Sequence, residues 1–264
     1  MGSVTRPLHP ALRPYVASCV GYDYRLPTDA VHHGVPSPAL TAIIAFDAPL
    51  DCGWVGETAS GRFWTLAAGL HTRPSLIRTH GSQVGLQLGL TPRGSRALLG
   101  VPAAPLASAL VPGDELGAAL PRCLHERLAP LGWAQRFTVL EEHLLGRLGR
   151  AGRAAHPVAE QGWRRLTGAP RRVEEVAGEL GISRRHLRNL FVAEFGLSPK
   201  EVAQVARFDR ARTLAARGVP LAQTAAAAGY ADQPHLTREW RRFAGLTPTA
   251  TLAEFPIVQD PLVE

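Results

Sequence analysis

The most regular hydrophobic pattern of the chain lies between residues 172 and 250, where apolar residues recur at helical spacing in two similar copies. Gly196-Leu197-Ser198-Pro199 in the first copy returns as Gly245-Leu246-Thr247-Pro248 forty-nine residues later. The same offset carries the apolar Phe191 onto Trp240. Because apolar residues three and four positions apart share one face of a helix, each copy predicts amphipathic helices.

A glycine divides each copy into two short helices. In the first copy an apolar stripe over residues 173–180 is followed by Gly181, whose freedom to adopt a positive φ suits the end of a helix. Ser183 is then placed to cap the next helix. The second copy repeats this arrangement around Gly229, with one extra residue before its second helix. Each copy therefore predicts a helix, a glycine turn and a helix.

The second helix of each copy leaves a polar and mostly basic face exposed. The residues expected on these two faces are Arg184, Arg185, Arg188, Asn189, Gln233, His235, Thr237, Arg238, Arg241 and Arg242. Two short helices around a glycine turn, the second of them basic, are typical of a helix-turn-helix that inserts its second helix into a DNA major groove. Many helical hairpins share one such pattern, but two in tandem with matched ends are far more specific.

A well-marked helix lies between the two copies. Ser198-Pro199-Lys200-Glu201 is a capping box with proline at the first helical position, and Gly218 and Pro220 end the helix after about Arg217. About eighteen residues at 1.5 Å each give roughly 27 Å, close to the ~34 Å rise of one DNA turn. Such a spacer would hold two recognition helices over successive major-groove segments on one face of a duplex.

In the first half of the chain the pattern indicates short β-strands. The candidate strands are residues 20–24, 40–46, 62–66, 76–80 and 84–90, with Gly, Pro, Asp and Ser between them. A short helix is expected over residues 10–17. Many short strands with turn signals predict a small antiparallel barrel or sandwich over residues 1–112.

From Gly113 the pattern becomes helical. A leucine recurs every four residues from Leu116 to Leu128, and residues 133–148 form a second amphipathic stretch. The leucine repeat fits either a dimer seam or packing against the barrel, so residues 113–150 are expected to be a dimerisation or packing segment. Residues 151–157 are expected to be a linker, and a helix is expected over residues 157–166.

The tandem motif resembles the DNA-binding domain of AraC-type transcriptional regulators. The residues that carry the resemblance are Ala225-Ala226-Ala227-Ala228-Gly229-Tyr230, Leu236-Thr237-Arg238-Glu239-Trp240-Arg241-Arg242 and Gly245-Leu246-Thr247-Pro248. The similarity covers about residues 160 to 255 and implies a monomeric double-motif domain that reads a long asymmetric DNA site. The fold class expected for the whole chain is α+β, with the all-α tandem domain at residues 158–255 and a tail at residues 256–264.

The resemblance implies DNA-contacting roles for the exposed residues. By position, base-reading residues are Arg185, Arg188 and Asn189 in the first motif and Gln233, His235, Thr237 and Arg238 in the second. Phosphate contacts are expected from Arg184, Arg241 and Arg242, whereas Arg185, Arg188 and Arg238 are suited to bidentate contacts with guanine. Pro234 departs from the polar residues often found at its position, so no base contact is expected from it. The alternative for these arginines is a solvated helix face.

The first half resembles, more faintly, the N-terminal sensor region of one AraC-type subgroup. The cues are His9-Pro10, Leu98-Leu99-Gly100-Val101-Pro102, Gly113-Asp114-Glu115-Leu116 and the ending at residues 255–261. In the wider family such a region is a cupin-like β-barrel with helices used for dimerisation, and it often binds a small effector. The candidate pocket residues are Tyr22, Trp54, Trp64, His71 and Arg78, because ligand sites combine apolar walls with a few polar anchors. Plain core packing is the alternative for the aromatic residues.

The net charge of +7 is a weaker guide than its distribution. All basic residues except Lys200 are arginine, which is what a GC-rich genome would also produce. Residues 171–245 hold thirteen basic and eight acidic residues, against thirteen and ten for residues 1–150. The positive excess is therefore concentrated in the tandem motif, which agrees with contact to DNA phosphates.

Three widely spaced cysteines argue against a disulfide framework and for a reducing cytoplasm. The absence of a long apolar run and of a signal-peptide pattern favours a cytoplasmic protein that binds no membrane. We find no nucleophile elbow, no paired catalytic carboxylates and no phosphate-binding glycine loop, so no catalytic residues, metal site or cofactor are expected. The expected partners are double-stranded DNA, a small-molecule effector, RNA polymerase and a second copy of the chain.

The sequence therefore predicts a transcription regulator, with two rival functions from other classes. The first is a DNA repair or modifying enzyme that uses an AraC-type domain and a reactive cysteine, for which Cys19, Cys52 and Cys123 are the candidates. The second is a scaffold whose tandem motif binds protein instead of DNA. Reactivity of the native thiols tests the first rival, and the dependence of DNA affinity on salt and base sequence tests the second.

Overall fold

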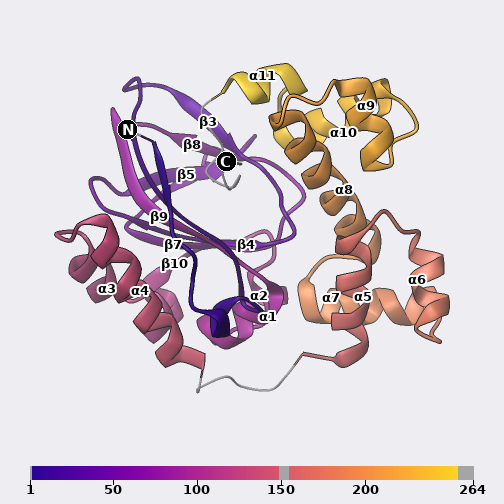
Figure 1. Cartoon of the computed structure of the whole chain (residues 1–264), viewed down its shortest axis with the longest axis horizontal. Helices are drawn as coiled ribbons and strands as arrows, with labels where there is room; N and C mark the ends of the chain where they lie inside the picture. The colour runs from indigo at the N-terminus through magenta and orange to yellow at the C-terminus, as the bar shows by residue number, and fades with distance from the viewer. Residues whose placement is uncertain (1, 149–154, 255–264) are drawn as a thin grey trace.

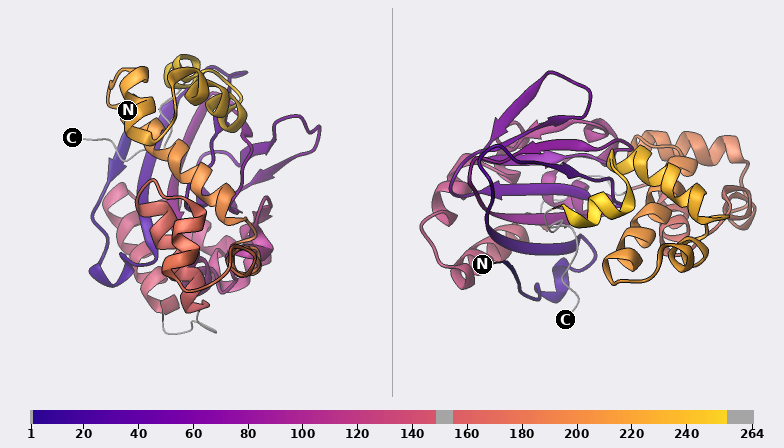
Figure 2. Two further views of the ribbon diagram at one scale, coloured as in Figure 1. Left: turned by 90° about the vertical axis from the view of Figure 1, so that its right-hand side faces the viewer. Right: turned by 90° about the horizontal axis from the view of Figure 1, so that it is seen from above.

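The computed structural model describes residues 2–148 and 155–254 and divides into a β-rich half and a helical half. Figure 1 and the right-hand view of Figure 2 show the helical half beside the two sheets. The α+β class predicted from the sequence is confirmed, with the strands confined to the first half and the tandem helical motif in the second. Within the described residues, no helix has the length and apolar character that a membrane span needs.

The β-rich half consists of two antiparallel sheets that pack face to face. One sheet has the order β1 (Ser3–Thr5), β2 (Val16–Arg25), β9 (Ser82–Leu90), β4 (Leu40–Ala45), β7 (Thr65–Ala68) and β10 (Leu110–Pro112). The other has the order β3 (Val31–Gly34), β8 (Ser75–Arg78), β5 (Leu50–Trp54) and β6 (Ser60–Phe63). Ile43 and Leu66 of the first sheet meet Leu50 and Cys52 of the second in a small buried cluster. Alternation along the strands thus gives each sheet an inner face.

Two expectations for this half were wrong in detail. The stretch 62–66 is not one strand, because β6 ends at Phe63 and β7 begins at Thr65 in the other sheet. The helix expected over residues 10–17 is only a 3-10 turn at Pro10–Leu12, after which Val16 already pairs with β9. In both places the local pattern suggested a single element. Pairing with distant strands instead divides each stretch into two elements.

Helices cover the outer face of the six-stranded sheet. They are α3 (Arg122–Leu128) and α4 (Trp133–Leu148), which lie along the sheet in Figure 1. Leu120, Leu124 and Leu128 are buried in the cluster that includes the outward residues of β4 and β9. These leucines therefore pack within the chain. The leucine repeat is not a single helix, because the 3-10 segment Gly113–Ala119 is broken at Gly117 and α3 begins only after Pro121.

A set of short helices joins the sheets to the helical half. After β9 come α1 (Pro92–Gly94), the π-helical turn Ser95–Leu99 and α2 (Ala103–Leu106). Their apolar residues belong to a buried cluster that continues from the sheet to Phe195 and Leu197 in the first motif. The two halves of the chain therefore share a continuous core.

The helical half follows the sequence pattern closely. It consists of α5 (Pro157–Gly168), α6 (Val173–Glu179), α7 (Arg184–Phe195), α8 (Pro199–Ala216), α9 (Leu221–Ala228), α10 (Gln233–Ala244) and α11 (Pro248–Ala253). Phe208, Trp240 and Phe243 form the centre of the second motif. Most of the linker expected at 151–157 and the tail at 256–264 lie outside the described residues.

Candidate nucleic-acid interface

Each recognition helix starts and ends in the same way in the two motifs. The Ser183 side chain accepts a hydrogen bond from the backbone N–H of His186 at the start of α7, and Asp232 accepts one from His235 at the start of α10. Gly196 and Gly245 then end these helices with left-handed backbones, at φ 73° and 77°. Side-chain caps and terminal glycines satisfy the backbone groups that a helix end leaves unpaired.

The structure places most of the predicted DNA-contacting side chains in solvent. Those that are exposed are Arg184, Arg185, Arg188, Asn189, Gln233, Arg238, Arg241 and Arg242. His235 and Thr237 are half-buried, and the His235 ring packs edge-on against Tyr230 with ring centroids 5.2 Å apart. Arg184 is paired with Glu174 of α6 at 3.0 Å. Both recognition helices therefore present exposed arginines, whereas His235 and Thr237 are less accessible to solvent.

A buried polar network fixes the second recognition helix to α8. Glu239 of α10 accepts hydrogen bonds from Arg207 Nε at 3.1 Å and Nη2 at 2.6 Å, and from the Tyr230 hydroxyl at 2.9 Å. Burial, and then the charge of Glu239, raise the pKa of the Tyr230 phenol. Burial disfavours the charge on Arg207, but the hydrogen bond and charge of Glu239 outweigh it and raise the pKa of Arg207. A charge-assisted pair of this geometry orients a helix as well as stabilising it.

Sequence reasoning did not assign a role to Glu239 or to a basic groove between the two motifs. The groove has a volume of about 500 Å³. Its charged lining residues are Arg171, Arg172, Lys200, Arg207 and Arg210 together with the carboxylates of Glu174 and Glu175, and Gly229 of the second motif also lines it. Burial lowers the pKa of Arg210, whose Nε has no hydrogen-bond partner among the described residues. The sequence does contain a signal for this groove, because Lys200, Arg207 and Arg210 recur at helical spacing. They give one polar face to α8, a helix that otherwise looks like a spacer.

The predicted effector-pocket residues fall in three separate places. Trp54 and His71 are buried together, with ring centroids 5.1 Å apart. Tyr22 and Arg78 line one small cavity of about 10 Å³, which is the space of a single water. Trp64 lies on the side of the sheet that α3 covers, and the centroids of the Trp64 and His125 rings are 4.5 Å apart.

The two polar pocket candidates, His71 and Arg78, already have hydrogen-bond partners in this structure. Arg78 bonds to Asp51 at 3.2 Å, and the His71 ring Nδ1 lies 2.6 Å from the Arg73 carbonyl oxygen. Burial lowers the pKa of His71 to about 4, so its ring is neutral near pH 7. A ligand that bound these two side chains would have to displace the existing hydrogen bonds.

The thiols and metal-ligand residues offer little for catalysis. Cys19 and Cys52 are buried, and burial raises the pKa of each to about 12. Cys123 is exposed. Within residues 2–148 and 155–254, the side chains of His, Cys, Asp and Glu form no group of three or more that would bind a metal ion. Low-pKa thiolates are what nucleophilic cysteine chemistry requires, and the two buried cysteines have the opposite tendency.

Comparison with known families identifies the helical half. Residues 176–254 match the family model of a helix-turn-helix domain. The C-terminal region is an AraC-type DNA-binding domain. The arrangement of α6–α7 and α9–α10 around α8 is the tandem arrangement that the sequence predicts for this domain.

Solved structures extend the similarity to the fold of the whole chain. ToxT from Vibrio cholerae O395 has a TM-score of 0.56 and 12% identity over 89% of this chain and 96% of its own. ToxT from V. cholerae strain SCE256, determined with a bound unsaturated fatty acid, has a TM-score of 0.55 and 12% identity over 94% and 97%. The ToxT fold therefore combines a β-rich half and a helical half as this chain does. The search of curated proteins gave no match.

Proposed function

We propose that the protein is a sequence-specific DNA-binding transcription regulator that acts in the cytoplasm. The observation that carries the proposal is the pair of recognition helices, each with exposed arginines, joined by the eighteen-residue helix α8. At 1.5 Å per residue α8 is roughly 27 Å long, which brings two recognition helices over successive major-groove segments. A scaffold that binds protein would not need two basic faces at this spacing.

The side chains divide into two roles in this proposal. Arg185, Arg188 and Arg238 read base edges, because a guanidinium matches the paired acceptors of guanine. Arg184, Arg241 and Arg242 hold phosphates. The basic groove along α8 lies between the motifs, beside the start of α6 and the turn at Gly229, so the backbone between the two major-groove segments is its natural occupant.

The β-rich half supplies regulation in this proposal. A ligand switches the protein only if it binds one arrangement of the chain more tightly than another. Two ToxT structures hold carboxylic acids, an unsaturated fatty acid and a methylnaphthalenyl butenoic acid, which makes apolar carboxylic acids the first effectors to test. Self-association and contact with RNA polymerase belong to the same proposal and are tested by the size and composition of operator complexes. The exposed Cys123 is the remaining candidate for thiol chemistry, and we propose no enzymatic activity for it.

The deciding experiment is selection of bound duplexes from a random-sequence pool with the full chain. We expect one enriched site with two half-elements about one helical turn apart. Retention of all sequences equally, or of none, would refute the regulator.

Substitutions separate the two roles on the selected site. Arg188→Ala should cost about 1–3 kcal/mol of binding free energy and relax the preference at one base pair. Arg241→Ala should weaken every sequence alike and lower the slope of log affinity against log salt by about one. Arg62→Ala, on the exposed face of β6, is the control for loss of a positive charge. Equal loss on all sequences for Arg188→Ala would show that Arg188 holds only the backbone.

A further inference from the structure

The β-rich half contacts the two motifs at equivalent positions, the glycines that end the recognition helices. A Cβ added at Gly196 would lie 2.3 Å from the Cβ of Ala107 and 3.0 Å from the carbonyl oxygen of Ala104. A Cβ added at Gly245, the counterpart of Gly196, would lie 3.3 Å from the His33 ring and 3.5 Å from Pro74. At Gly196 the backbone of α2 itself approaches so closely that only glycine fits, whereas at Gly245 the side chains of His33 and Pro74 pack against the end of the helix.

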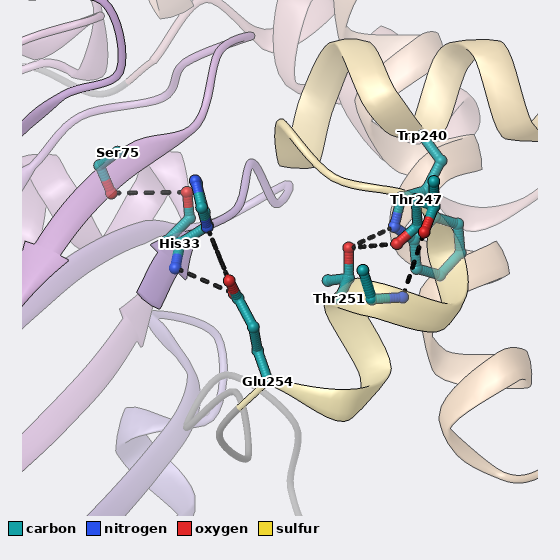
Figure 3. Close-up of polar contacts among 8 residues, drawn as sticks. His33, Ser75, Trp240, Thr247, Thr251 and Glu254 are labelled. Atoms are coloured by element: carbon teal, nitrogen blue, oxygen red, sulfur yellow. Dashed lines mark hydrogen bonds and ion pairs between the residues drawn. The ribbon is translucent and has the colours of Figure 1, made fainter. Parts of the chain in front are cut away.

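A polar contact between the β-rich half and the helical half lies near each of these two glycines. Next to Gly196, Arg96 of the β-rich half pairs with Glu194 of α7 at 2.5 Å, and both side chains are less than one-fifth exposed. In the second motif, the backbone N–H of His33 donates to Glu254 Oε2 at 3.2 Å, and the ring Nδ1 lies 3.0 Å from Oε1 (Figure 3). Hydrogen bonds to a charged group that are partly buried hold their geometry better than exposed ones do.

The contact at Glu254 reaches the second recognition helix through α11. The Trp240 indole N–H donates to Thr251 Oγ1 at 3.0 Å, which ties α11 to α10 (Figure 3). Apolar packing runs in parallel, because the fully buried Val35 belongs to the cluster of Phe208, Trp240 and Phe243. The β-rich half therefore contacts the second motif both through its hydrophobic core and through a polar contact at its surface.

The DNA-reading side chains remain free while these contacts are made. Arg185 and Arg188 lie in the first half of α7, and Arg238 lies in the first half of α10, whereas the contacts are at the helix ends. All three side chains are exposed in this structure. The contacts are therefore compatible with DNA binding and do not cover the interface.

Along the chain, α8 joins the two motifs, and helices of this length bend. The β-rich half contacts both motifs, so the two motifs are connected through it as well as through α8. We propose that the β-rich half is a brace that fixes the separation of the two recognition helices, and so determines the spacing of the half-elements that the protein accepts. The inference rests on the proposed function, because spacing has meaning only for a bound operator.

The test compares operators whose half-elements are moved apart or together by one and two base pairs. It uses the full chain and a released variant, Arg96→Gln with Glu254→Gln, which weakens both polar contacts with little change of shape. Arg6→Gln is the matched control, because the Arg6–Glu141 pair lies within the β-rich half. Affinities are measured by fluorescence anisotropy at one salt concentration, and thermal melting confirms that each variant is folded.

We expect the wild type and the control to lose affinity by roughly tenfold for a shift of one base pair. The released variant should lose clearly less, while its affinity for the preferred spacing changes little. An unchanged spacing profile would refute the brace. So would an equal gain or loss at every spacing, which would indicate an inhibitory contact or a purely structural one. Failure of every chain to bind any duplex would instead refute the proposed function.

A distance measurement gives an independent test that needs no DNA. Spin labels at Val192→Cys and Thr249→Cys, both exposed positions after the recognition residues of each motif, report the separation of the motifs. The exposed Cys123 is replaced by serine, and the buried Cys19 and Cys52 are left in place. The brace predicts a narrow distance distribution in the wild type and a broader one in the released variant. Identical distributions would contradict it.

Discussion

At the scale of single residues, the three thiols should react very differently. Burial raises the pKa of Cys19 and Cys52 to about 12, whereas Cys123 lies in solvent. Because only the thiolate attacks a disulfide reagent, we expect one fast thiol in the native protein at pH 8 and three in denaturant. Titration with a chromogenic disulfide gives both counts. Replacing Cys123 by serine should remove the fast phase and leave operator affinity unchanged. A second fast thiol would revive the modifying-enzyme alternative.

The buried His71 should make the stability of the protein depend on pH. Burial lowers its pKa to about 4 in the folded chain, whereas an unfolded histidine titrates near 6.5. The unfolded chain therefore binds more protons between these values, and the free energy of unfolding falls as the pH falls through this window. The expected loss is roughly 2 kcal/mol between pH 6.5 and 5, an upper bound for one group.

Urea unfolding of His71→Gln over pH 5 to 8 measures this contribution. Glutamine keeps an N–H donor for the Arg73 carbonyl oxygen but does not titrate. The difference between wild type and variant should shrink as the pH falls from 6.5 to 5. His186→Gln, at an exposed position, controls for loss of any histidine. Parallel curves for the wild type and His71→Gln would contradict the neutral buried ring.

At the scale of elements, two helix-ending glycines should differ in what they tolerate. Gly181 and Gly196 both have positive φ, at 67° and 73°. Apart from its chain neighbours, no atom of the described residues lies within 4 Å of a Cβ added at Gly181, whereas one at Gly196 would collide with Ala107. Gly181→Ala should cost only the backbone term, about 1–2 kcal/mol. Gly196→Ala should cost more, because α2 must also move. Thermal melting of the two variants compares the costs, and equal losses would show that α2 yields freely.

The helical elements were predictable because their signals are local. Ser183, Asp232 and the terminal glycines mark the ends of α7 and α10, and the apolar stripe marks the buried face. The strands were less predictable. β3 and β5 were missed, because their residues alternate weakly and are held by pairing with β8, more than twenty residues away from either strand. The break at Trp64 likewise depends on two different sheets and not on the residues beside it.

At the scale of the whole molecule, the sequence shows neither the contact between the halves nor the groove beside α8. His33, Val35 and Ala107 belong to no periodic pattern, and each acquires its role from a surface that lies far away along the chain. Glu239 is a similar case, since an acidic residue in a basic helix gives no sign of Arg207 as its partner. The exposure of the arginines was predictable because it depends only on the face of the helix that carries them.

The operator and the contact between the two halves are both proposed to fix the same separation of the recognition helices. Operator binding should therefore strengthen that contact. Coupling between two binding events is reciprocal, so a brace that favours one spacing is itself favoured by DNA of that spacing. Hydrogen exchange of the full chain measures this at the amides of β3, Val31–Gly34, and of α2, Ala103–Leu106. We expect slower exchange at both on the preferred operator and a smaller effect on an operator with altered spacing. The β6 strand, Ser60–Phe63, is the internal control at the far edge of its sheet. Faster exchange at β3 and α2 on the preferred operator would mean that DNA separates the halves, and unchanged exchange would mean that the two are not coupled.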